Sequence, residues 1–111
     1  GHCTGRLVTG GRGNRPESAF DAEKVFSACR DHGTAIEINC RPPERRDPPA
    51  RLIDLGLHLG CLFAIDTDAH APPVSWTGSD SGANVPRNGG VEPEDVVNTW
   101  PVEQLLQWTA G

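Results

Sequence analysis

Two helical segments and two strand-like segments alternate along the chain, and this order constrains the fold more than any other feature of the sequence. Apolar residues at helical spacing predict helices over 16–32 and 50–59, each followed by a terminating glycine. Alternating or continuous apolar residues predict strands over 34–40 and 62–66. Helix, strand, helix, strand is the order that yields parallel strands joined by right-handed crossovers, so we expect an α/β fold.

Each predicted strand gathers its polar side chains on one face. Glu37 and Asn39 share a face of the first strand, and Asp66 and Asp68 share a face at the end of the second. If helices cover the apolar faces, these polar groups look into a site such as a barrel interior, because buried polar groups need partners. The alternation is equally compatible with an antiparallel sheet whose polar face is solvated.

Asp68 and His70 follow the second strand directly and are two residues apart, so their side chains point to the same side of the backbone. A carboxylate oxygen and a neutral imidazole nitrogen are suitable ligands for Zn²⁺ or Mn²⁺. The alternative is that Asp68 caps the next segment and His70 is a surface loop residue, since this spacing is common by chance.

The chain of 111 residues fits one small domain, and its 13 Gly and 10 Pro predict long loops. A net charge of −5 does not favour tight binding to a phosphate backbone, so nucleic acid stays open as a partner without support from overall charge. No apolar run is long enough for a membrane span. There is no Met, and the chain starts at Gly1 inside a loop, so we expect a fragment of a longer protein.

The cysteines Cys3, Cys29, Cys40 and Cys61 have no C-x-x-C spacing, and three of them fall in or beside apolar segments. We therefore expect reduced, mostly buried thiols and a cytoplasmic location. A disulfide is one alternative. A zinc module in which Cys3, Cys40 or Cys61 converges with His2 is another, although the spacing fits no known finger.

The segment 1–15 is rich in Gly and Arg, which is typical of a loop. One interpretation is an anion-binding loop in which Arg6, near His2, contacts a phosphate through its forked guanidinium. For Arg12 and Arg15 we favour a solvated connection.

The last forty residues divide into a long loop and two short helices. The stretch 71–90 lacks apolar periodicity, and it is either a genuine lid or a local reading-frame slip in the source gene, with Trp76 as a partly exposed apolar anchor. Over 92–110 we expect short helices that begin at Pro93 and Pro101. Their apolar residues should pack inward, and Asn98 should brace the corner between them; the inward set is Val96, Val97, Leu105, Leu106 and Trp108.

Four motifs occur in an order and spacing that resemble the PHP (polymerase and histidinol phosphatase) domain family, closest to the domain attached to bacterial family X DNA polymerases. They are Gly1-His2-Cys3-Thr4-Gly5-Arg6, Glu37-Ile38-Asn39, Thr67-Asp68-Ala69-His70 and Val97-Asn98-Thr99-Trp100-Pro101. The resemblance covers 1–70 and about 91–110. It implies the C-terminal part of a distorted seven-stranded β/α barrel, with 71–90 as an atypical loop.

The resemblance also implies a set of site residues. His2, Asp68 and His70 resemble metal ligands of the family, which binds ions such as Mn²⁺ or Zn²⁺ at the carboxyl ends of its strands. Glu37 and Asn39 match a motif that lines the interior beside the site. Arg6 is the expected phosphate contact.

Family members hydrolyse phosphate esters of small molecules or at DNA 3′ ends, so the resemblance implies a metal-dependent phosphoesterase. The family's earlier His-x-His element and the Glu and His ligands after it are absent from this chain. His32 and His58 fall on predicted helices and do not replace them. The alternative is therefore a non-catalytic remnant that depends on a missing N-terminal part of the barrel.

Overall fold

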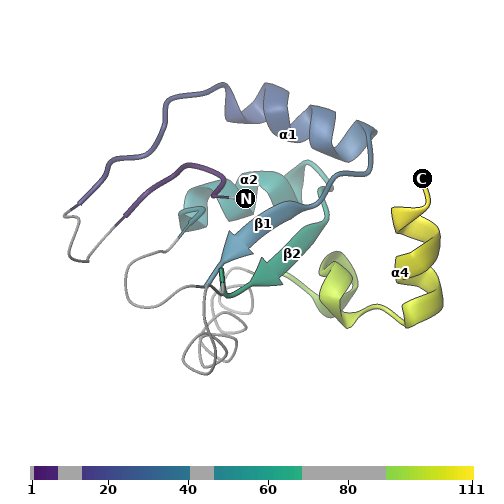
Figure 1. Cartoon of the computed structure of the whole chain (residues 1–111). Helices are drawn as coiled ribbons and strands as arrows, with labels where there is room; N and C mark the ends of the chain where they lie inside the picture. Colours follow the sequence, from purple (N-terminus) through teal and green to yellow (C-terminus); the bar gives the residue numbers. More distant parts are fainter. Residues whose placement is uncertain (1, 8–13, 41–46, 69–89) are drawn as a thin grey trace.

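The computed structural model describes residues 2–7, 14–40, 47–68 and 90–111. Its described part is a mixed α/β structure with three α-helices and a small parallel sheet (Figure 1). In chain order the elements are α1 (Ala22–Asp31), β1 (Ile36–Asn39), α2 (Ala50–His58), β2 (Phe63–Asp66), the 3₁₀ turns η2 (Pro93–Asp95) and η3 (Val97–Thr99), and α4 (Val102–Thr109).

The strands β1 and β2 are parallel, as their alternation with helices predicts. Ile36 pairs with Phe63, and Asn39 pairs with Asp66 at the carboxyl end. This register brings polar side chains from two distant segments to one edge of the sheet. The described strands form a two-stranded sheet. The predicted barrel is therefore not shown by the described residues.

Helix α2 covers the apolar face of the sheet, as the strand patterns predict. Ile36, Ile38 and Phe63 are at most 4% exposed on this face. Contact between helix and sheet is closest at Gly56, where an added Cβ would lie 3.0 Å from both Ile36 Cδ1 and Phe63 Cζ. Glycine is required here because the backbone of α2 approaches the strand side chains directly.

Helix α1 begins at Ala22, so the predicted start at Pro16 is wrong. The Asp21 side chain caps the helix by accepting from the Lys24 backbone N–H. The preceding residues pair instead with the N-terminal segment: Ser18 N donates to Thr4 O at 2.8 Å, and Arg15 bridges to Leu7. These backbone hydrogen bonds hold the segment extended and outweigh its local helical signals.

The C-terminal segment packs beside β2 through its first half. Val96, between η2 and η3, forms a parallel bridge with Phe63, and both Val96 and Val97 are buried as predicted. Helix α4 is different: it has no buried residue, and Leu106 is 62% exposed, so the expected inward packing of Leu106 is wrong. Trp108 makes the contact that holds α4, donating from Nε1 to Gly33 O at 2.8 Å.

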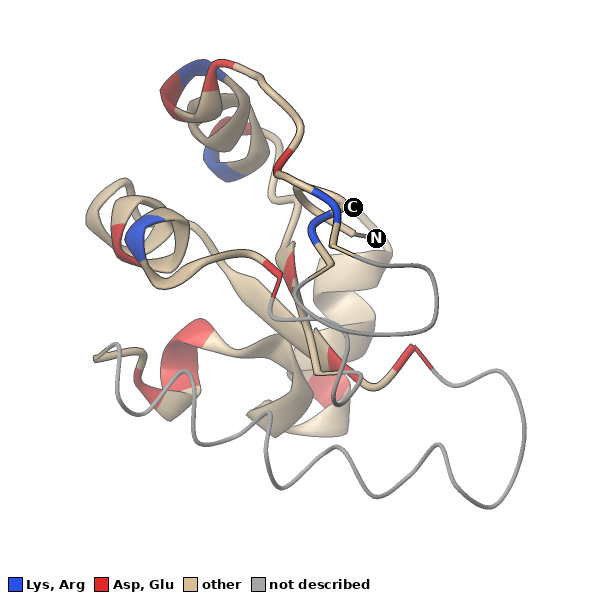
Figure 2. Cartoon of the chain, turned by 90° about the vertical axis from the view of Figure 1, so that its left-hand side faces the viewer, with Lys and Arg blue, Asp and Glu red and all other residues tan. Residues whose placement is uncertain are grey.

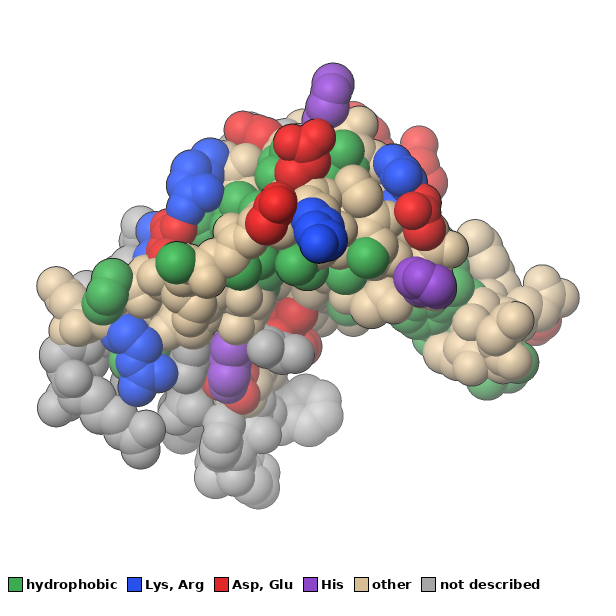
Figure 3. Space-filling model, turned by 90° about the horizontal axis from the view of Figure 1, so that it is seen from above, with side chains coloured by type: hydrophobic (Ala, Val, Ile, Leu, Met, Phe, Trp, Pro, Cys, Tyr) green, Lys and Arg blue, Asp and Glu red, His purple; other side chains and the backbone are tan. Residues whose placement is uncertain are grey.

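Charged residues are distributed over the described surface without a strong segregation. Lys and Arg lie on α1, on α2 and in the N-terminal segment, whereas acidic residues also follow the strands (Figure 2). On the face shown in Figure 3, the described acidic and basic side chains are interspersed. Among the described residues, no helix combines the length and apolar character that a membrane crossing requires.

Candidate active site

A tight turn carries His2 onto the polar face of β1. Gly5 N donates to His2 O at 3.0 Å, and both residues have positive φ angles, 55° for His2 and 67° for Gly5. The His2 backbone N–H donates to the Glu37 carboxylate. The face of β1 that bears Glu37 and Asn39 therefore looks onto the N-terminal turn, which is the polar environment that its alternation predicts.

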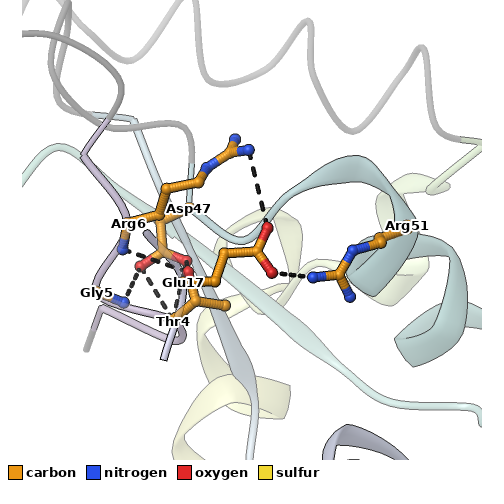
Figure 4. Close-up of polar contacts among 6 residues, drawn as sticks. All are labelled: Thr4, Gly5, Arg6, Glu17, Asp47 and Arg51. Atoms are coloured by element: carbon orange, nitrogen blue, oxygen red, sulfur yellow. Dashed lines mark hydrogen bonds and ion pairs between the residues drawn. The ribbon is translucent and has the colours of Figure 1, made fainter. Parts of the chain in front are cut away.

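Asp47 anchors this turn. No sequence pattern marks it, because it lies in a Pro- and Arg-rich stretch without helical or strand periodicity. Its carboxylate accepts from Thr4 N at 2.9 Å, Thr4 Oγ1 at 2.7 Å and Gly5 N at 3.0 Å (Figure 4). Asp47 and Thr4 are each 1% exposed. A buried carboxylate with several donors at these distances is fixed in position, and it fixes the Thr4 and Gly5 backbone that donates to it.

His2 and Asp68 meet at the carboxyl end of the sheet, although 65 residues separate them in sequence. His2 Nε2 lies 3.9 Å from Asp68 Oδ2, with 42% of the His2 side chain and 15% of the Asp68 side chain exposed. Asp68 has a φ of 53°, and its N–H is bonded to Asp66 Oδ1 at 3.0 Å. This turn directs the Asp68 carboxylate toward the His2 ring.

Asn39 contacts the other nitrogen of the His2 ring. Asn39 Nδ2 lies 3.3 Å from His2 Nδ1 and 3.3 Å from Glu37 Oε1, and Asn39 is 2% exposed. With the amide nitrogen toward the ring, Nδ1 accepts and the ring proton sits on Nε2, facing Asp68. Binding of a cation through Nε2 requires the proton on Nδ1, so the Asn39 oxygen would then have to face the ring.

Glu37 and Asp66 form a carboxyl pair across the two strands. Burial acts to raise the pKa of Glu37, but hydrogen bonds from the Asp66 carboxyl and the His2 backbone outweigh it, so this pKa is lowered. Partial burial, the hydrogen bond to Glu37 and its negative charge raise the pKa of Asp66 to about 6. Below about pH 6 the pair therefore holds one proton, which resides on Asp66.

The fit of this arrangement to a divalent cation is partial. Two ligands at 2.0–2.2 Å around one tetrahedral ion lie roughly 3.4 Å apart, so the 3.9 Å between His2 and Asp68 is within about half an ångström of that separation. The third expected ligand, His70, lies outside the described residues, as does the atypical loop up to residue 89, with Trp76. Within 2–7, 14–40, 47–68 and 90–111, no three His, Cys, Asp or Glu side chains form a metal-binding group.

Arg6 extends away from the turn toward Glu17. Arg6 Nη1 lies 4.0 Å from Glu17 Oε1, and Arg51 on α2 pairs with the other oxygen of the same carboxylate (Figure 4). The predicted phosphate contact is thus one of two arginines that share one carboxylate. Arg12 lies outside the described residues.

All four cysteines are free thiols in the structure. Burial, followed by the charge of Asp47, raises the pKa of Cys3 to about 11. Burial, followed by the charges of Asp66 and Glu37, likewise raises the pKa of Cys40 to about 11. Cys61 is buried and donates to Phe26 O at 3.2 Å. In the described residues, which include all four thiols and His2, these side chains form no group of three that could hold a metal ion.

Comparison with known proteins gives one informative likeness. A probable phosphatase from Aliivibrio fischeri is 29% identical to this chain over 73 residues, which cover 60% of the chain and 29% of the relative. This chain therefore spans less than a third of the relative's length. No family model matches the chain.

Proposed function

We propose that this chain carries part of the active site of a metal-dependent phosphoesterase of the PHP type, within the C-terminal portion of a distorted seven-stranded barrel. The observation that carries the proposal is the approach of His2 Nε2 to Asp68 Oδ2, at 3.9 Å, at the carboxyl ends of parallel strands. In folds of this kind, chemistry gathers where the strands end. The likeness to a probable phosphatase supports the same reaction class.

His2, Asp68 and His70 would hold a divalent cation, Mn²⁺ or Zn²⁺. Such a cation supplies Lewis acidity to a phosphate ester and offsets its negative charge. Asn39 orients the His2 ring through Nδ1, and Glu37 holds the His2 backbone N–H. Binding through Nε2 requires the Asn39 amide to turn its oxygen toward Nδ1, and in that orientation these contacts would hold the ring in place for the cation.

Arg6 would contact the substrate phosphate, and doing so requires its guanidinium to exchange Glu17 for the ester oxygens. The substrate is either a small phosphorylated metabolite or a DNA 3′ end. Binding of DNA would rest on local contacts, because the net charge is −5 and the described surface intersperses both signs (Figure 3). A cytoplasmic location suits the four free thiols.

The second candidate is a non-catalytic remnant that requires further parts of a barrel. It is favoured by the finding that the described residues supply two converging ligands and no complete group of three. A cation held by few ligands is bound weakly and is poorly oriented for catalysis.

Isothermal titration of the chain with Mn²⁺, together with hydrolysis of p-nitrophenyl phosphate, distinguishes the two candidates. The variants are His2→Ala, Asp68→Asn and His70→Ala, and the matched control is His58→Ala, which removes an exposed imidazole from α2. A retained site binds Mn²⁺ in the wild type and in the control, and each ligand variant weakens binding at least about tenfold. A folded chain that takes up no Mn²⁺ or Zn²⁺ would refute the phosphoesterase proposal for this polypeptide.

A further inference from the structure

Three segments, namely the turn 2–5, the end of β1 at Asn39, and Asp47, are joined by hydrogen bonds in a closed ring around His2. The Asp47 carboxylate accepts from Thr4 N at 2.9 Å and from Gly5 N at 3.0 Å. Gly5 N also donates to His2 O, which closes the turn. On the other side, the Asp47 carbonyl accepts from Asn39 N at 2.8 Å, and the Asn39 side chain contacts the His2 ring at 3.3 Å.

Asp47 is the one member of this ring that holds His2 from both directions. Its side chain holds the backbone of the turn, and its main chain holds the strand end whose Asn39 side chain meets the imidazole. The turn needs such support because His2 adopts a φ of 55°, a conformation that costs a non-glycine residue energy. Full burial of Asp47 and Thr4 keeps water from competing for these bonds.

We propose that Asp47 is a positioning residue, which acts through Thr4, Gly5 and Asn39 to aim the His2 imidazole at Asp68. Only the test by Mn²⁺ titration rests on the proposed function, because the orientation of the His2 ring is measurable without metal.

The first test is the nuclear Overhauser contact between the His2 ring and the Asn39 side-chain amide. Asp47→Asn keeps the size of the side chain but replaces one acceptor oxygen with a donor that opposes the turn's N–H groups. We expect this variant to lose the contact and the exchange protection of the Thr4 and Gly5 amides. Thr4→Val removes the hydroxyl, which donates to Asp47 at 2.7 Å and accepts from Arg6 N at 3.3 Å, and should weaken both signals. Thr4→Ser keeps the hydroxyl and should retain them.

The matched control is Asp21→Ala, which removes another hydrogen-bonded carboxylate but one that caps α1, away from the turn. It should lower the thermal midpoint while leaving the His2 contact intact. Loss of the contact in Asp21→Ala to the same degree would overturn the proposal, because the effect would then follow global stability. Retention of the contact in Asp47→Asn would overturn the proposal directly. If that variant does not fold, the comparison of Thr4→Val with Thr4→Ser decides, and an equally strong contact in both would overturn the proposal.

The second test is Mn²⁺ titration of the same variants. Asp47→Asn should weaken binding about 10–100-fold, the usual cost of losing a group that orients a metal ligand. Wild-type affinity in Asp47→Asn would overturn the proposal. If the wild type itself binds no Mn²⁺, the proposed function fails, and the Overhauser contact still decides the role of Asp47.

Discussion

The side chain of Asn98 pairs with the backbone of Ile65 as a neighbouring strand would. Ile65 N donates to Asn98 Oδ1 at 2.7 Å, and Asn98 Nδ2 donates to Ile65 O at 3.0 Å. Together with the bridge between Val96 and Phe63, this pairing satisfies the side of β2 that faces away from β1. The amide therefore holds the strand end that presents Asp66 and Asp68.

Asn98→Ala should lower the free energy of unfolding by about 1–2 kcal/mol, because it removes two hydrogen bonds of which each contributes about 1 kcal/mol at most. Urea denaturation measures the change. Asn98→Asp should be at least as destabilising, since a carboxylate oxygen would face the Ile65 carbonyl. Asn14→Ala, at an exposed position of the same residue type, should change stability by less than about 0.5 kcal/mol. Equal effects at both positions would contradict the pairing.

Gly56→Ala should destabilise the protein by about 1–3 kcal/mol, because the new methyl would overlap Ile36 and Phe63 in a packed core. Helix propensity alone predicts the opposite sign, a gain of about 1 kcal/mol. Thermal unfolding monitored by circular dichroism separates the two. Asp54→Ala, on the exposed side of α2, is the control and should be nearly neutral. A more stable Gly56→Ala variant would show that α2 does not pack tightly on the sheet.

Asp66 should make stability depend on pH in the weakly acidic range. Its pKa is raised from an ordinary 3.8 to about 6, so its contribution is complete below about pH 3.8 and is lost as the pH rises through about 6. The pKa of Glu37 is lowered, so this group affects stability in the opposite sense. Its stabilising contribution is complete above pH 4.5, its ordinary pKa, and is lost as the pH falls through its lower pKa in the folded protein. The urea midpoint of the wild type should therefore fall relative to that of Asp66→Asn as the pH rises through about 6. Parallel profiles for the two proteins would rule out the shared proton.

Cys40 should resist alkylation and should stabilise the fold less at high pH. Its pKa rises from 9.0 to about 11, so the stability gained by burying a neutral thiol is complete below pH 9 and is lost as the pH rises through 11. Mass spectrometry after iodoacetamide treatment at about pH 8 should find Cys40 unmodified in the folded protein. Cys40→Ala should be less stable than the wild type at neutral pH, with a smaller difference above pH 9. Rapid modification of Cys40 without unfolding would contradict its burial.

The sequence by itself determined the order of the main helices and strands, and that order favoured the parallel pairing that the structure shows over the antiparallel alternative. Apolar residues at helical spacing located α1 and α2, and alternation separated the apolar face of β1 from the polar face with Glu37 and Asn39. These features depend on neighbours in the chain, where the periodicities of helix and strand are visible. The starts and ends of elements were less determined, and Pro16 failed to begin α1 because Thr4 and Leu7 pair with the residues that follow and precede it.

Only the tertiary structure decided which groups support the site. Asp47 lies in a stretch with no periodicity, and its role arises from hydrogen bonds to Thr4 and Gly5, more than forty residues away in the chain. The approach of His2 to Asp68, the sharing of Glu17 by two arginines and the exposure of Leu106 have the same origin. Each depends on contacts between segments distant in sequence, whose geometry is set by how the turn, the sheet and the helices pack together.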